Sequence, residues 1–157
     1  MNKEEVLLRC TQSRKAMRDT LDTLGEDDFI HPQVEGVWTI KDLLGHLTSW
    51  ENTCLIPLKL MVNGGSFQAE IIADHDAWNA EQATRKSKLP IKNIIEEWES
   101  VHNELDKTFN QLSDEQRIQV FSLPWGDQGN ALDMLSGLAW HEEEHLKAVN
   151  AWLEKKT

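Results

Sequence analysis

Apolar residues recur along most of this chain at steps of three and four positions, the spacing that places side chains on one face of an α-helix. Alternating polar and apolar runs of strand length are hard to find. The clearest stripe follows Pro90 and consists of Ile91, Ile94, Ile95, Trp98, Val101, Leu105, Phe109 and Leu112. The sequence therefore predicts an all-α protein.

The same spacing predicts three more long helices. The first carries Val6, Cys10, Met17, Leu21 and Leu24, and Gly25 is expected to end it in the left-handed conformation. The second begins after Thr39, which with Asp42 forms an N-terminal cap, and ends before Asn63-Gly64-Gly65. Pro57 lies inside it and should kink or break it. The last helix runs from about Ala131 to about Glu154.

Shorter features fill the connections between these helices. An ancillary helix is expected within Glu70 to Lys86, a short helical turn at Ser113 with Gln116, and a loop from Phe121 to Gly126. Four long amphipathic helices with extended connections make a four-helix bundle. We expect residues 1–157 to form one such domain, because the length suits a single domain.

The charge and the cysteine content limit which classes of partner and which cellular compartment are expected. With 16 Lys and Arg against 27 Asp and Glu the net charge is −11, so neither nucleic acid nor an anionic membrane surface is an expected partner. The 2 cysteines are too few for a disulfide framework. No stretch has the length of a spanning helix, and the first residues lack the apolar core of a secretory signal. We expect a cytoplasmic protein.

Two histidines on the last predicted helix point along its apolar stripe. His141 and His145 are one turn apart, a spacing at which two imidazoles can bind one metal ion. The alternative, that they are hydrogen-bonded core histidines, is equally open from the spacing. A metal site needs a third ligand, for which His46 is the best candidate, although it lies at the border of its stripe and periodicity also allows a half-exposed side chain. Of the others, His102 is expected on a helix flank and His31 and His75 in solvated connections.

The string His141 to His145 also matches the HExxH pattern of zinc proteases. We disfavour that interpretation, because so short a motif arises by chance in a charged helix, where Glu142 to Glu144 can simply form a solvated face.

Two segments together resemble a known family. They are Gly36-Val37-Trp38-Thr39-Ile40-Lys41-Asp42-Leu43-Leu44-Gly45-His46-Leu47 and Trp140-His141-Glu142-Glu143-Glu144-His145-Leu146. Both are similar to motifs of the DinB-like superfamily of four-helix bundles. The resemblance implies an up-down-down-up bundle, and a divalent metal bound by three histidines that correspond here to His46, His141 and His145. Zinc, nickel and iron(II) all accept such nitrogen ligands.

Relatives in that family include thiol-dependent transferases and isomerases and colibactin-resistance proteins. The His-Tyr pair of the resistance branch is absent here, since the chain has no Tyr, which argues against a resistance role. The resemblance also implies that a homodimer is common, and that a low-molecular-weight thiol can act as cofactor.

These observations lead to two functional hypotheses. In the first, the metal activates a thiol or water against a small-molecule substrate, Glu51 or Glu142 acts as base, and the pocket is formed by Trp38, Trp50, Trp125 and Trp140. In the second, the protein is a non-catalytic, ligand-binding or dimerising bundle whose histidines are structural or hold an adventitious ion. The four tryptophans can equally be core or helix-contact residues.

Overall fold

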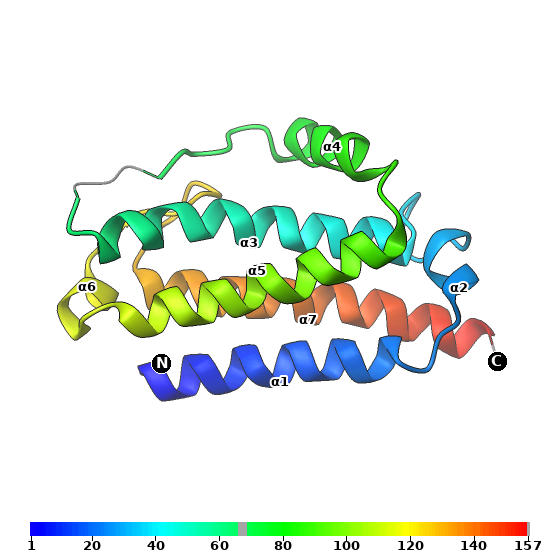
Figure 1. The fold of residues 1–157 in the computed structure, drawn as a ribbon, viewed down its shortest axis with the longest axis horizontal. Coiled ribbons are helices and arrows are strands. Elements are labelled where there is room, and N and C mark those ends of the chain that lie inside the picture. Colours follow the sequence, from blue (N-terminus) through cyan, green and yellow to red (C-terminus); the bar gives the residue numbers. More distant parts are fainter. Residues whose placement is uncertain (66–68, 157) are drawn as a thin grey trace.

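Four long helices form most of the computed structural model, which describes residues 1–65 and 69–156 (Figure 1). They are α1 (Lys3–Leu21), α3 (Ile40–Val62), α5 (Ile91–Gln111) and α7 (Ala131–Lys156). Helices α1 and α7 run in one direction along the bundle, and α3 and α5 run in the opposite direction (Figure 1). The predicted all-α, up-down-down-up four-helix bundle is confirmed.

The most extensive contacts join helices that run the same way, α3 with α5 and α1 with α7. Parallel neighbours cannot be joined by a short turn, so the chain returns along the outside of α3 before α5 begins (Figure 1). The ancillary helix α4 (His75–Lys86) lies on this return path and packs against α3. It begins at His75 rather than Glu70 because the Asp74 side chain accepts a hydrogen bond from Ala77 N at 3.0 Å and caps it there.

Capping signals located the helix starts better than the helix ends. Thr39 caps α3 as predicted, and Ser113 with Gln116 caps the short helix α6 (Asp114–Ile118). The expectation for Gly25 was wrong. Helix α1 already ends at Leu21, and Gly25, with φ of −86°, precedes a further short helix, α2 (Glu26–Ile30). The Asp28 carboxylate accepts a hydrogen bond from the Gly25 amide, which fixes this start.

The sequence predicted a kink or a break at Pro57, and the break is wrong because helix α3 continues through it. Proline removes one backbone hydrogen bond and costs about 3 kcal/mol inside a helix. Buried side chains lie on both sides of it, including Cys54 and Leu58, which are fully buried in the core. Packing of both halves of the helix against the bundle offsets the cost.

A small hairpin precedes α7 where the sequence predicted only a loop. Strand β1 (Phe121–Ser122) pairs with β2 (Gln128–Gly129) in antiparallel register, and two residues are too few to show alternation in a sequence. Gly126 turns the chain between them with φ of +106°, a conformation that favours glycine. The amide of Ile72 donates to the Pro124 carbonyl at 2.8 Å, which ties the hairpin tip to the return path beside α3.

The core consists of two apolar clusters separated by a layer of buried polar side chains. One cluster contains Leu58, Phe109 and Met134, and the other contains Leu44, Ile94 and Trp98. The buried polar layer comprises Arg14 on α1, Glu51 on α3, His102 on α5 and Glu142 on α7. Each lies between residues of the two clusters along its own helix, so all four long helices contribute to the layer.

Among the described helices, none combines the length and the apolar character needed to cross a lipid bilayer.

Candidate metal centre

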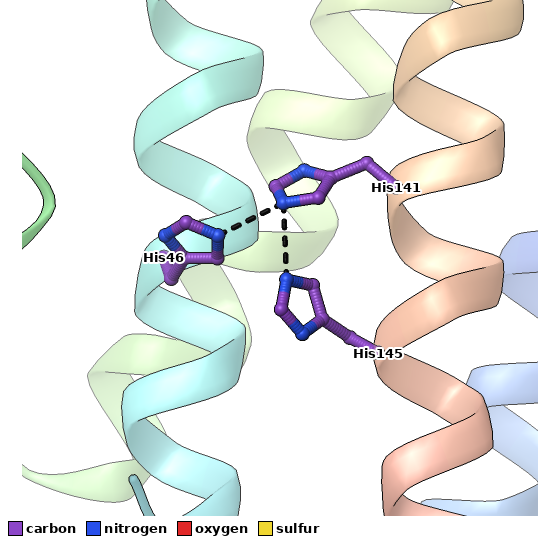
Figure 2. A group of neighbouring side chains, drawn as sticks. All are labelled: His46, His141 and His145. Atoms are coloured by element: carbon purple, nitrogen blue, oxygen red, sulfur yellow. Dashed lines mark hydrogen bonds between the residues drawn. The ribbon is translucent and has the colours of Figure 1, made fainter. Parts of the chain in front are cut away.

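Three imidazoles meet between α3 and α7 (Figure 2). The Nε2 atom of His141 lies 2.9 Å from Nε2 of His46 and 3.0 Å from Nε2 of His145. All three rings thus turn the same nitrogen toward one point. Within the described parts of the chain they form the one group of three or more histidine, cysteine or carboxylate ligands compact enough to hold a metal ion.

The local sequence explains how these rings are presented. The cap at Thr39 starts α3, which places His46 in its second turn, and the spacing of four on α7 stacks His141 and His145 on one face. His46 is 8% exposed, so a residue at the border of the apolar stripe is buried by its contact with α7. The structure brings the three predicted ligands together.

Burial keeps two of these rings uncharged. It lowers the pKa of His46 to about 2, with smaller contributions from the nearby His141 and His145 rings. It lowers the pKa of His141 to about 3, again with a smaller contribution from His145. Both imidazoles are therefore neutral at neutral pH and have a lone pair available for a metal ion.

The spacing of the nitrogens is close to that of a tetrahedral metal site. Metal–nitrogen bonds of about 2.0–2.1 Å place neighbouring ligand atoms about 3.3 Å apart. The Nε2 separations of 2.9 and 3.0 Å differ from this value by a few tenths of an ångström, a change that side-chain torsions readily accommodate. The donor set thus fits a divalent transition metal.

A residue that the sequence did not reveal fixes the orientation of His145. The Glu35 carboxylate lies 2.5 Å from Nδ1 of His145, so Nδ1 carries the proton and Nε2 presents its lone pair to the cluster. Glu35 is held by a tight turn in which Trp38 N donates to the Glu35 carbonyl at 2.9 Å. One acid in a loop, 110 residues from its partner, carries no signal in a single sequence.

Both predicted bases lie in the buried polar layer instead of beside a cavity. The Arg14 guanidinium donates from Nη2 to Glu51 at 2.8 Å and from Nε to both oxygens of Glu142 at 3.0 and 3.1 Å. Nδ1 of His102 lies 3.2 Å from the Glu51 carboxylate, so the expected flank position of His102 was wrong. The Arg14 guanidinium is thus the counter-charge of both glutamates, and neither of them lines the cavity beside the three histidines.

A cavity of about 600 Å³ opens beside the cluster, with His46 and His141 in its wall. Three of the four predicted tryptophans line it, namely Trp50, Trp125 and Trp140. Trp38 instead packs against the ring of His46, with centroids 4.7 Å apart. His75, which was expected to be a solvated connector, also lines the cavity.

Trp125 occupies its place because α7 has a glycine beneath it. A methyl group on Gly137 would lie 2.9 Å from Cζ2 of the Trp125 ring, closer than such atoms approach. The indole therefore rests directly on the backbone of α7, one turn before His141. Across the cavity, the Trp50 indole donates to the side-chain oxygen of Asn79 on α4 at 3.0 Å. Two of the aromatic walls are thus fixed in position.

Comparison with known proteins agrees with this architecture. Residues 9–149 match the sequence model of the DinB superfamily. A protein from Oceanobacillus iheyensis, for which a metal-dependent hydrolase activity has been proposed, is 24% identical over 139 residues, or 88% of this chain and 78% of the relative.

Solved structures show the same fold at low sequence identity. A mycothiol-dependent maleylpyruvate isomerase superposes with a TM-score of 0.80 at 16% identity over 95% of this chain, which spans about 60% of the isomerase's length. YfiT from Bacillus subtilis, described as an unusual four-helix bundle with a proposed metal-dependent hydrolase activity, gives 0.76 at 14% identity over 99% of this chain and 90% of its own.

Proposed function

The chain belongs to the DinB superfamily, and from that premise we propose that it is a metal-dependent enzyme that acts on a small molecule. The observation that carries the proposal is the convergence of three Nε2 atoms, from His46, His141 and His145, at the wall of a cavity of about 600 Å³. A purely structural cluster of histidines has no need of a cavity beside it. Cavities of this size are typical of small-molecule sites.

Three neutral imidazoles suit zinc, nickel or iron(II) and leave further coordination positions open, as catalytic sites do. When bound, such an ion lowers the pKa of a water molecule or thiol at an open position and so supplies a nucleophile at neutral pH. The proposed hydrolase activity of the O. iheyensis relative supports water, and the thiol dependence of the isomerase supports a low-molecular-weight thiol.

The chain's own residues hold and shape this site. The Glu35 carboxylate accepts a hydrogen bond from Nδ1–H of His145 and so keeps Nε2 directed at the other two rings. Trp50 and Trp125 line two walls of the cavity and offer flat apolar surfaces to a substrate. The buried polar layer helps to fix the rotation of α7, because Glu142, which binds Arg14, is adjacent to His141 on this helix.

Elemental analysis tests the metal site directly. Wild-type protein purified without chelators should contain close to one equivalent of zinc, nickel or iron, and a variant with alanine at His46, His141 and His145 should contain none. His31→Ala, which removes an exposed histidine near α2, serves as the matched control and should retain the metal. No metal in the wild type after reconstitution would overturn the proposal.

Catalysis is tested on the metal-loaded protein with a panel of thiols and of ester, amide and epoxide electrophiles. Turnover that disappears in the triple variant supports the enzyme. Stoichiometric metal with no turnover across the panel, together with tight binding of a ligand, would favour the non-catalytic binding bundle instead.

A further inference from the structure

The cavity beside the three histidines has walls of unusual charge. Besides the tryptophans, its lining includes two exposed acidic residues, Asp127 on the hairpin loop and Asp133 in the first turn of α7. No Lys or Arg is among the described residues that line it. The whole chain carries a net charge of −11, which adds to the negative potential. A carboxylate or phosphate ligand therefore meets no Lys or Arg side chain among these lining residues.

Aromatic walls complement this charge. The faces of tryptophan rings carry negative electrostatic potential and attract ammonium groups, more strongly where water is excluded. Trp125 is fixed over Gly137, and Trp140, which is 55% exposed, stands at the edge of the cavity next to His141. Acidic groups and indole faces in one cavity together favour a positively charged organic ligand over a neutral one.

Helix α7 also sets the length of such a ligand. Asp133, Gly137 and His141 follow one another at intervals of four residues and so form one stripe along the helix. At a rise of about 1.5 Å per residue, Asp133 and His141 are about 12 Å apart along the axis. The two ends of the cavity wall thus have different chemistry, with carboxylates at one end and imidazoles at the other.

We propose that the cavity binds an organic cation, with an amine or quaternary ammonium group at Asp127 and Asp133, an apolar body along Trp125, and its other end at the three histidines. The assignment of that other end as the reacting end rests on the proposed function. The cation subsite itself depends only on the cavity walls. The two aspartates disfavour a dianionic ligand at this end of the cavity.

Three probes of one shape test the charge preference. Choline phenyl ether is a cation that cannot ligate a metal, 3,3-dimethylbutyl phenyl ether is its uncharged isostere, and 4-phenoxybutanoate carries a negative charge. Their affinities are measured by tryptophan fluorescence on the protein as purified and again after zinc loading. We expect the cation to bind about tenfold tighter than the isostere, and the anion to bind weakest without added metal.

Variants that remove negative charge test whether Asp127 and Asp133 cause the preference for the cation. Asp127→Asn with Asp133→Asn should reduce cation affinity about fivefold and leave the neutral isostere unchanged. The Asp133→Asn side chain keeps an oxygen that can accept the hydrogen bond from the Asn130 backbone amide, which now lies 3.0 Å from the Asp133 carboxylate. Asp19→Asn with Asp27→Asn removes the same charge from the opposite end of the bundle and should leave the preference intact (Figure 1).

The possible outcomes test the cation subsite and the proposed enzyme separately. Equal binding of cation and isostere, no binding of the cation, or an equal loss in the Asp19 and Asp27 control would overturn the cation subsite. A protein that prefers the cation but never acquires metal would overturn the proposed enzyme and leave the subsite standing. A protein that acquires metal but does not prefer the cation would overturn the subsite and leave the proposed enzyme standing.

Discussion

Replacing Arg14 with methionine should be among the most destabilising substitutions in the bundle. The Arg14 side chain is 2% exposed, and its guanidinium binds Glu51, Glu142 and the Trp98 carbonyl, the last at 2.7 Å. It also stacks over the Trp98 ring at 4.0 Å. Methionine fills most of the volume but leaves two buried carboxylates without a counter-charge, and removing one partner of such a pair costs about 3–5 kcal/mol. That is a large part of a typical total stability of about 5–15 kcal/mol.

Urea unfolding at neutral pH, followed by far-UV circular dichroism, measures this loss. Burial already raises the pKa of Glu142, and loss of Arg14 should raise it further. A carboxyl group whose folded pKa lies above its unfolded value favours the folded state at low pH, so the loss should shrink as the pH falls toward 5. Combining Arg14→Met with Glu51→Gln and Glu142→Gln should recover more than half of the unfolding free energy that Arg14→Met alone loses. A loss below about 1 kcal/mol for Arg14→Met would refute the argument from uncompensated charge.

Three further outcomes follow from the site. Glu35→Gln should weaken metal binding about 10- to 100-fold in a chelator competition, and unchanged affinity would show that the carboxylate does not orient its ligand. Gly137→Ala places a methyl group 2.9 Å from the Trp125 ring, so it should shift tryptophan emission and cost about 1–3 kcal/mol; an unchanged spectrum and stability would contradict the contact. The pKa values of His46 and His141, about 2 and 3, lie below the unfolded value of about 6.5. As the pH falls, the unfolded state therefore binds protons at a higher pH than the folded state does. The metal-free protein should therefore lose thermal stability from about pH 6.5 downward, and a constant melting temperature between pH 7 and 5 would contradict this.

Periodicity and caps were sufficient to predict the bundle because the physics behind them is local. Thr39 begins α3 through contacts with the next turn alone, and the apolar stripe after Pro90 needs only helical geometry. The spacing of His141 and His145 is local in the same way, whereas His46 was selected from its border position by the family resemblance. Pro57 shows the limit, since tertiary packing offset a strong local preference.

The missed features all depend on contacts between distant segments. His102 was placed on a flank because its own helix gives no reason to bury it, and only Glu51 on another helix supplies its partner. Glu35 lies in a loop, and it contacts His145 only when α7 packs beside that loop. Trp125 is held by a glycine on another element. Such pairings require three-dimensional information that one sequence does not contain.

The pairing of the first and last helices has a consequence for how the protein matures during synthesis. Of the four long helices α1 is synthesised first, yet its main partner α7 is synthesised last, so the apolar face of α1 stays exposed until α7 has been made. His46 likewise meets His141 across 95 residues of chain. Contacts of such long range slow folding, so we expect the bundle to close only after α7 has left the ribosome, and binding of the proposed metal would be a late step. Cells short of the proposed metal would then accumulate metal-free and less stable protein, which proteases remove first.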